Sequence, residues 1–214
     1  MRRLLFAKLG EGVWLSHLDT MRLMQRAFSR AGYPLKYSQG FSPKPYLSAA
    51  LPLSVGTESI CEILDYELTD GGSVTPERLN AVMPEGIRIL KAYDSERKIK
   101  DLAFLQTNIT LEYDGGVPKE DEVAALFKMN SLIVTKFSKK GEVETEIRPM
   151  IKTCVVSRKS ENELALQCVL SAQNPSLNPA MITAALEKYL PDLKPDFARY
   201  KRMETLDENL EVFR

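Results

Sequence analysis

Residues 14–52 read WLSHLDTMRLMQRAFSRAGYPLKYSQGFSPKPYLSAALP and join a helix start, a helix and a stiff loop. Ser16 fits a helix N-cap, and Asp19 at the third helical position completes a pair that resembles a capping box. Apolar residues then recur every three or four positions: Leu18, Met21, Met24, Ala27, Phe28 and Ala31. This spacing predicts an amphipathic helix that begins after Ser16. Gly32 and Pro34 end it.

Strand and helix patterns surround this stretch in a regular order. We expect strands over residues 2–9, 59–68 and 86–93, and short strand pieces at 35–37 and 49–53. A second helix begins at Pro76, where proline suits the first helical position, and ends before Pro84. The first half thus reads β-α-β-β-α-β, which is the order of a ferredoxin-like fold.

The second half repeats this order. Strands are predicted over residues 103–113, 132–137, 147–157, 163–171 and 197–206, and helices over 118–129 and 178–190. The extra strand near residue 150 is the one departure from a clean repeat. We therefore predict an α+β protein of two ferredoxin-like halves with antiparallel sheets. The first domain spans residues 1–95 and the second 101–214, joined by the charged segment 94–100.

The composition limits the cellular setting. No apolar run approaches the ~20 residues that span a bilayer, so no membrane association is expected. The apolar run near the N-terminus ends at Lys8 and Glu11, too early for a signal peptide. The three cysteines form no CxxC pair, and their odd number argues against a disulfide framework. We expect a cytoplasmic protein with Cys61 and Cys168 as buried thiols.

Charge is unevenly distributed, although the formal net charge of the 214 residues is zero. Residues 1–60 hold eight basic and three acidic residues, a net charge of +5. The remainder holds 21 basic and 26 acidic residues, a net charge of −5. This polarity favours attraction of an anionic partner to one end of the molecule. A solvated basic face is the alternative.

The basic residues of the first helix are regularly spaced. Arg22, Arg26 and Arg30 recur at i, i+4 and i+8, so they lie along one flank. Guanidinium groups in such a row can contact phosphates. The alternative is a solvated flank on which Asp19 pairs with Arg22.

The loop that follows, YSQGFSPKPY at residues 37–46, combines aromatic rings with two prolines and a glycine. Aromatic side chains can stack on unpaired bases while lysines meet the backbone. The predicted binding residues of the loop are Lys36, Tyr37, Gln39, Gly40, Phe41, Lys44 and Tyr46. We expect an ordered loop that lines the main cleft of the N-terminal half beside the basic helix. Alternatively, Phe41 fills the core and residues 38–40 form a simple turn.

Catalytic signatures are sparse. His17 is the sole histidine and is the candidate general acid or base. A structural histidine at a helix start is the alternative. The sequence has no Walker loop, GxGxxG, HExxH or cluster-binding set of three cysteines, so we predict no metal and no cofactor. Glu62 and Asp65 fall on opposite faces of one strand, which weakens a two-carboxylate mechanism.

Residues 14–66 also resemble a known family, the radical-SAM-associated domain of unknown function. That domain occurs alone or fused behind a cobalamin-binding radical SAM protein. The resemblance is dense over residues 14–66. It is carried by Ser16-His17-Leu18-Asp19, Arg22, Gln25-Arg26, Arg30-Ala31-Gly32, Tyr37-Ser38-Gln39-Gly40-Phe41, Pro43, Pro45, Pro52-Leu53, Gly56, Ser59 and Glu62. The resemblance implies a radical SAM enzyme as partner in trans, since this chain lacks the cluster cysteines. It implies no established activity.

Three functions fit these observations. The first is a non-catalytic binding module that contacts RNA or presents a substrate to a radical SAM enzyme. The second is a metal-independent endoribonuclease, in which His17 is the acid or base and Arg22, Arg26 and Lys44 hold the scissile phosphate. The paired ferredoxin-like layout is similar to that of repeat-associated endoribonucleases, which is an analogy of fold alone. The third is a protein–protein adaptor that docks through its aromatic loop.

Overall fold

The structure, a computed structural model, describes residues 1–138, 141–173 and 175–214. It has an α+β fold in which the strand pairs within each unit are antiparallel, as the sequence predicts. The chain divides into two compact units. Unit 1 comprises Met1–Ile99 together with Arg214, and unit 2 comprises Lys100–Phe213.

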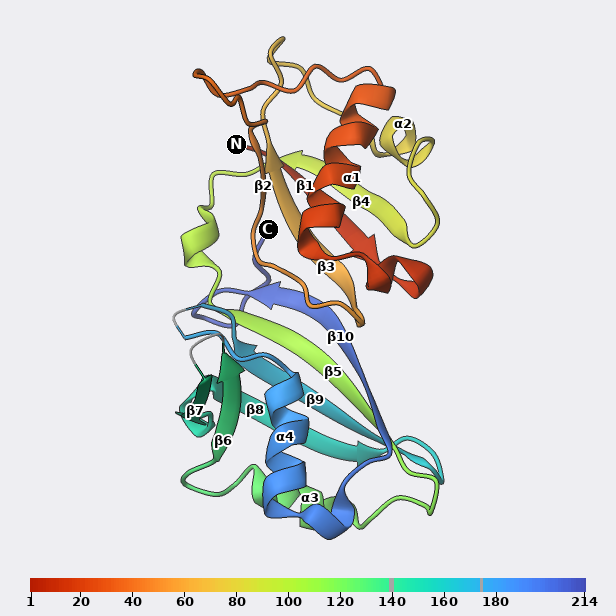
Figure 1. Ribbon diagram of the computed structural model, residues 1–214, viewed down its shortest axis with the longest axis vertical. Coiled ribbons are helices and arrows are strands. Elements are labelled where there is room, and N and C mark those ends of the chain that lie inside the picture. The colour runs from red at the N-terminus through yellow and green to blue at the C-terminus, as the bar shows by residue number, and fades with distance from the viewer. Residues whose placement is uncertain (139–140, 174) are drawn as a thin grey trace. The chain divides into compact units, whose positions relative to one another are not determined.

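Unit 1 is a sheet covered by helices. Its elements are β1 (Arg2–Lys8), the 3-10 turn η1 (Gly10–Trp14), α1 (His17–Arg30), β2 (Leu47–Ala49), β3 (Thr57–Tyr66), α2 (Pro76–Asn80) and β4 (Ile87–Asp94). The strands run in the order β4-β1-β3, and β2 pairs with β3. Helices α1 and α2 lie on the same face of this sheet (Figure 1). The expected strand pieces at 35–37 and 49–53 are instead single bridges, Leu35 to Leu68 and Tyr37 to Pro45, and the short strand β2.

The core of unit 1 lies between the helices and the sheet. Met24 and Phe28 of α1 are fully buried there, and the Phe28 ring lies 5.2 Å from that of Tyr66. Leu18, which the sequence places in the same apolar stripe, is 65% exposed. Since each helical residue turns by about 100°, Leu18 lies about 120° around the helix from Met24 and faces solvent.

The other face of β1 holds a buried ion pair. The Arg3 side chain is inaccessible to solvent, and it donates to both carboxylate oxygens of Asp65, at 2.6 and 3.0 Å. Asp65 is the register partner of Arg3 on β3. The Arg3 guanidinium also donates to Ser95 Oγ at 3.1 Å and to the Arg97 carbonyl at 3.0 Å. This network stabilises the face of the sheet that lies away from α1.

Unit 2 contains four antiparallel strands of the main sheet and a separate hairpin. Its elements are η2 (Ile99–Asp101, which begins at the last residue of unit 1), β5 (Phe104–Glu112), α3 (Glu120–Leu126), β6 (Ile133–Ser138), β7 (Gly141–Glu146), η3 (Arg148–Met150), β8 (Ile151–Arg158), β9 (Glu163–Ser171), α4 (Ala180–Tyr189), η4 (Pro191–Leu193) and β10 (Phe197–Leu206). The main sheet has the order β10-β5-β9-β8, and β6 pairs only with β7 among the described strands. Figure 1 shows α4 against one face of this sheet.

The position of the extra strand corrects the sequence prediction. The strand near residue 150, β8, belongs to the main sheet, whereas the strand predicted over 132–137 pairs off with β7. The Glu146 carboxylate holds the base of this hairpin, since it accepts from the amides of Leu132 at 2.8 Å and Arg148 at 3.0 Å. A hydrogen bond from the Ser131 hydroxyl, followed by these two amide bonds, lowers the pKa of Glu146. Among the described residues, no helix has the length and apolar character that crossing a membrane requires.

Candidate nucleic-acid interface

Helix α1 begins at His17, directly after the predicted N-cap residue Ser16. Ser16 has an extended backbone, and its hydroxyl accepts from the Asp19 amide at 3.1 Å. The same hydroxyl donates to the Asp19 carboxylate at 2.7 Å, and Arg22 lies 3.3 Å from the other carboxylate oxygen. The Ser16 hydrogen bond, followed by Arg22, lowers the pKa of Asp19. These bonds fix the first turn of α1, and the positions of the arginines along the helix follow from it.

The three arginines line one cleft of about 720 Å³. The other lining residues are Leu15, Asp19 and Leu23 from the α1 side, and Val82, Met83 and Pro84 from the segment after α2. All three arginines are exposed. The cleft thus combines a cationic helix flank with an apolar opposite wall, which suits a ligand that carries both phosphates and apolar ring faces.

The arginines differ in how far they are engaged. Arg22 makes the exposed pair with Asp19, and Arg30 donates to the Val82 carbonyl at 2.8 Å. Arg26 has no hydrogen-bond or ion-pair partner within the part of the chain that the structure describes. An exposed pair such as that of Arg22 contributes only about 0–1 kcal/mol, so an incoming phosphate can displace it.

The aromatic loop has an ordered stem. Tyr37 bridges to Pro45, and Ser38 and Lys44 exchange two hydrogen bonds, from the Ser38 amide to the Lys44 carbonyl at 2.9 Å and from the Lys44 amide to Ser38 Oγ at 3.0 Å. At the tip, Gly40 has a φ of 124°, a backbone conformation that residues with a side chain rarely adopt. Gly40 therefore allows the turn that carries Phe41.

The loop presents its aromatic rings to solvent. Phe41 is fully exposed at 112%, and Tyr37 and Tyr46 are 41% and 44% exposed. The alternative in which Phe41 fills the core is therefore wrong. Gln39, Gly40 and Lys44 are exposed as well.

Lys36 is less available than the sequence implies. Its ammonium pairs with Glu67 at 2.8 Å and lies 5.1 Å from the centre of the Tyr46 ring. The Glu67 carboxylate raises the pKa of Lys36, so its positive charge is retained but partly neutralised by this neighbour.

The loop does not line the arginine cleft, which corrects the expected composite site. Tyr37 instead accepts from Gln25 at 2.9 Å and lines a separate cleft of about 340 Å³ that also includes Ser29. Gln25 and Ser29 each precede an arginine of the row, so they lie about 100° around α1 from it. The two clefts therefore lie along neighbouring flanks of one exposed helix face.

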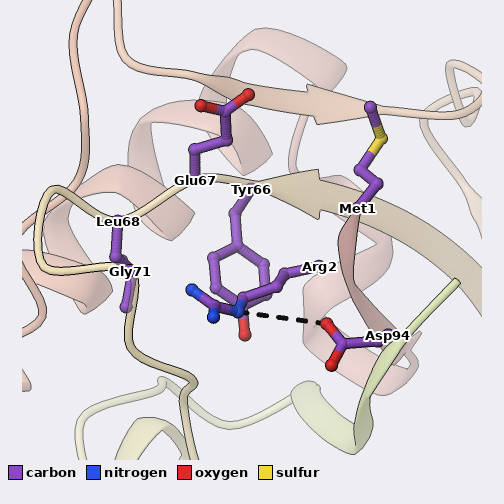
Figure 2. Close-up of a pocket in the computed structure, with 7 residues that line it drawn as sticks. All are labelled: Met1, Arg2, Tyr66, Glu67, Leu68, Gly71 and Asp94. Carbon is purple, nitrogen blue, oxygen red and sulfur yellow. Dashed lines mark ion pairs between the residues drawn. The ribbon is translucent and has the colours of Figure 1, made fainter.

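Figure 2 shows a further cleft of unit 1, at the end of β1, β3 and β4, with a volume of about 520 Å³. The Arg2 guanidinium lies beside the Tyr66 ring, and its Nε is 3.9 Å from an Asp94 carboxylate oxygen. Glu67 also lines this cleft. None of the predicted site residues lines it, although Glu67 holds Lys36 of the loop.

His17 lies away from the arginine cleft. It lines a small pocket beneath the start of α1 together with Lys8 and Glu62. The pocket has a volume of about 20 Å³, enough for about one water molecule. His17 is about 140° around the helix from Arg22. The predicted ribonuclease arrangement, with His17 beside the arginines, is therefore not assembled.

Two buried charged residues, Lys8 and Glu62, lie with His17 in this pocket, and the sequence did not predict that they would lie together. Lys8 is 1% exposed and donates to the Leu15 carbonyl at 2.6 Å, and Glu62 is 7% exposed. Lys8 shares the inward parity of Leu4 and Phe6 on β1, a signal that was available in the sequence. No group of three or more His, Cys, Asp or Glu side chains that could hold a metal ion occurs in the described ranges.

Comparison with known proteins places the chain in a family. The model of a family described as an uncharacterized protein conserved in bacteria, DUF2344, matches residues 2–179. The chain belongs to the DUF2344 family. A search of curated proteins gives no significant match for this DUF2344 chain.

Two solved structures are similar to the DUF2344 chain in fold. One is the crystal structure of a Cbf5–Nop10–Gar1 complex, with a TM-score of 0.57 and 8% identity over 95% of this chain and 48% of the matched chain. The other is the archaeal box H/ACA sRNP Nop10–Cbf5 complex, with a TM-score of 0.50 and 9% identity over 95% and 47%. This chain spans about half the length of the chains it matches.

Proposed function

We propose that this protein is a non-catalytic module that binds single-stranded RNA across the exposed face of α1. The observation that carries the proposal is the arginine-lined cleft in which Arg26 has no partner among the described residues. A cationic side chain that lines a cleft and pairs with no described residue can bind an anionic group of a ligand, such as a phosphate.

The second support is the pairing of cationic and apolar surfaces. Successive arginines are about 6 Å apart along the helix axis, so each can contact a different phosphate. Across the cleft, Val82, Met83 and Pro84 offer apolar atoms to base faces. Unpaired bases are available for such contacts, whereas those of a duplex are stacked on one another, which favours a single strand.

The third support is the loop on the neighbouring flank. Phe41 stands at the tip, and Tyr37 is tied to α1 through Gln25. A strand that crosses the exposed face of α1 meets the arginines on one side and these rings on the other. One of the two neighbours of similar fold is described as an sRNP complex, and at 8% and 9% identity both neighbours support the fold alone.

The proposal is tested by salt-dependent RNA binding. The affinity of the chain for a single-stranded RNA is measured by filter binding at several salt concentrations, for the wild type and for Arg22→Ala/Arg26→Ala/Arg30→Ala. Each phosphate contact to a single strand contributes about 0.7 to the slope of log affinity against log salt, so the triple variant is expected to lose about 2 from the slope.

The matched control is Lys119→Ala/Lys128→Ala/Lys152→Ala, which removes three exposed positive charges from unit 2. It is expected to keep the wild-type slope. An unchanged slope in the arginine variant, or an equal loss in both variants, overturns the proposal. Loss of binding to a protein partner with RNA affinity intact would favour the adaptor function instead.

We also propose a radical SAM enzyme as the partner in trans. The support is the resemblance of residues 14–66 to the radical-SAM-associated domain. The test is gel filtration of the chain mixed with a purified cobalamin-binding radical SAM enzyme that lacks this domain. Co-elution is expected, and separate elution at micromolar concentrations contradicts the proposal.

We infer that the two units are ferredoxin-like repeats and that each is a domain. The strand order supports the repeat, because β4-β1-β3-β2 in unit 1 corresponds to β10-β5-β9-β8 in unit 2. In this correspondence the hairpin β6–β7 is an insertion between α3 and β8. Separate expression of residues 1–99 and 100–214 tests the inference, and cooperative unfolding of each fragment is the expected result.

A further inference from the structure

Two of the three cysteines face each other in unit 2. Cys154 of β8 and Cys168 of β9 are direct register partners in the antiparallel pair. Their Sγ atoms are 3.3 Å apart, with the Cys168 thiol donating to Cys154. The sequence predicts Cys168 as a buried thiol and does not reveal this neighbour, because the pairing follows from the register of the hairpin.

The backbone geometry permits a covalent bond between them. Residues directly opposite each other on antiparallel strands have Cα atoms about 4.5–5.5 Å apart, inside the range of about 4.4–6.8 Å that a disulfide spans. The sulfur atoms must approach by about 1.3 Å to reach the S–S bond length of about 2.0 Å. Side-chain rotation and small strand adjustments can supply that approach.

We propose that Cys154 and Cys168 are a thiol-oxidation site that closes to a reversible intramolecular disulfide. The oxidant is a low-molecular-weight disulfide such as oxidised glutathione. This inference is independent of RNA binding, since it rests on residues of unit 2 alone.

Accessibility sets the order of the reaction. Cys154 is half-buried, and its strand β8 pairs only with β9 among the described strands, whereas Cys168 is inaccessible to solvent. The oxidant therefore meets Cys154 first. The hydrogen bond to Cys154 and burial raise the pKa of Cys168, so its thiolate is scarce and it is suited to the second, intramolecular step.

The reaction balances as two thiol–disulfide exchanges. The Cys154 thiolate attacks one sulfur of oxidised glutathione, whose S–S bond breaks and releases one glutathione, which takes up the proton lost by Cys154. The Cys168 thiolate then attacks the Cys154 sulfur, and the second glutathione leaves with the proton of Cys168. Two protein thiols are oxidised, and one glutathione disulfide is reduced to two thiols.

The test uses the full chain under native conditions. The protein is incubated with oxidised glutathione, quenched with an alkylating agent in denaturant, and its thiols are counted. The count is expected to fall from three to one, and a sample taken before alkylation should have an intact mass about 2 Da lower than that of the reduced protein. Trypsin cleaves after Lys152, Arg158, Lys159 and Lys188, so the disulfide should link peptide 153–158 to peptide 160–188.

The third cysteine and two variants serve as controls. Cys61 is buried in unit 1 beside Ser59, and Cys61→Ser should leave the disulfide unchanged. Cys168→Ser should stop at a glutathione adduct on Cys154, and Cys154→Ser should keep both remaining thiols. Retention of three thiols by the wild type, a stable adduct on its Cys154, or a link that involves Cys61 overturns the proposal.

Discussion

Two neighbouring arginines on β1 lie in different environments, so we expect their removal to reduce the free energy of unfolding by different amounts. Arg3 is fully buried in a bidentate pair with Asp65, whereas Arg2 is partly exposed and lies 3.9 Å from an exposed Asp94. Arg3→Met leaves a buried carboxylate without its charge partner, so we expect a loss of about 3–5 kcal/mol in the free energy of unfolding. Urea unfolding followed by circular dichroism measures it.

The control for this prediction is Arg2→Met, with an expected loss within about 1 kcal/mol. The double variant Arg3→Met/Asp65→Leu should recover much of the stability, because it removes both charges from the core. Equal losses in Arg2→Met and Arg3→Met would contradict the assignment of this pair.

Because Tyr113 is buried, we expect the free energy of unfolding to fall at high pH. Its ring is 6% exposed and its hydroxyl donates to the Leu193 carbonyl at 3.2 Å. Burial, assisted by the negative charge of Asp196, raises the pKa of Tyr113 to about 12 from an ordinary value of 10.0. The unfolded chain therefore loses this proton first, and the stability contribution is complete below pH 10 and is lost as the pH rises through about 12.

The measurement is urea unfolding between pH 9 and pH 12 for the wild type and Tyr113→Phe. Other tyrosines and the lysines titrate in the same window, so the difference between the two proteins isolates Tyr113. The stability of Tyr113→Phe should fall less steeply with pH, and parallel curves would show that Tyr113 does not contribute.

At the scale of elements, η1 and the turn before β4 meet backbone to backbone. The Leu9 amide donates to the Gly86 carbonyl at 2.8 Å, and a Cβ on Gly12 would lie only 2.6 Å from that carbonyl oxygen. This contact fixes the distance between the two walls of the arginine cleft, because Leu15 follows η1 and Pro84 precedes the turn.

Gly12→Ala is therefore expected to destabilise the protein by about 1–3 kcal/mol and to weaken RNA binding as well. Gly115→Ala is the control, since a Cβ there meets no atom within 4 Å. Thermal unfolding and filter binding provide the two readouts. Wild-type behaviour of Gly12→Ala would mean that the turn yields without altering the cleft.

The aromatic loop predicts an effect on binding without an effect on stability. Phe41 is fully exposed, so Phe41→Ala removes no core contact and should leave the unfolding temperature unchanged. If its ring stacks on a base, affinity for single-stranded RNA falls by about 1–3 kcal/mol, or about 5–150-fold. Phe197→Ala, a change at a ring that is 60% exposed in unit 2, should not alter affinity. Equal affinities for wild type and Phe41→Ala would remove the loop from the interface.

The accuracy of the sequence predictions varied with the strength of the local pattern. The bounds of β9 and β10 agree with the prediction, because β9 alternates in burial and polar turns flank both strands. The strand β7 was missed because its sequence GEVETE has Val143 as its one apolar residue, and that residue is 50% exposed. Period-two alternation cannot detect a strand that buries neither face.

The candidate site likewise has parts that a local sequence pattern predicts and parts that it does not. The arginine row follows from spacing within one helix, and the orientation of His17 follows from the same geometry. The wall formed by Val82, Met83 and Pro84 lies more than 50 positions from Arg30, and it depends on the way in which α2 and β4 pack in the fold. No local pattern contains that information.

At the scale of the whole molecule, the segment 207–213 packs back on the preceding strand, which the sequence did not indicate. Phe213 is fully buried, its amide donates to the Thr205 carbonyl at 2.8 Å, and its carbonyl accepts from the Thr205 hydroxyl at 2.9 Å. The Asp207 carboxylate accepts from two amides of the intervening turn, those of Asn209 and Glu211. Residues 207–213 thus fold back on β10, the strand that pairs with β5.

Phe213→Ala should therefore destabilise the protein by about 3–5 kcal/mol, the cost of removing a large buried ring and leaving a cavity. Val212→Ala is the matched control, because Val212 is the preceding residue and is 51% exposed, so a loss within about 0.5 kcal/mol is expected. Urea unfolding of both variants measures the difference. Since β5 and β10 are about 90 residues apart in the chain, their pairing closes a long loop and depends on contacts that hold β10 in place. If the two variants lose equal stability, the tail is a passive extension and β10 is held by its pairing with β5 alone.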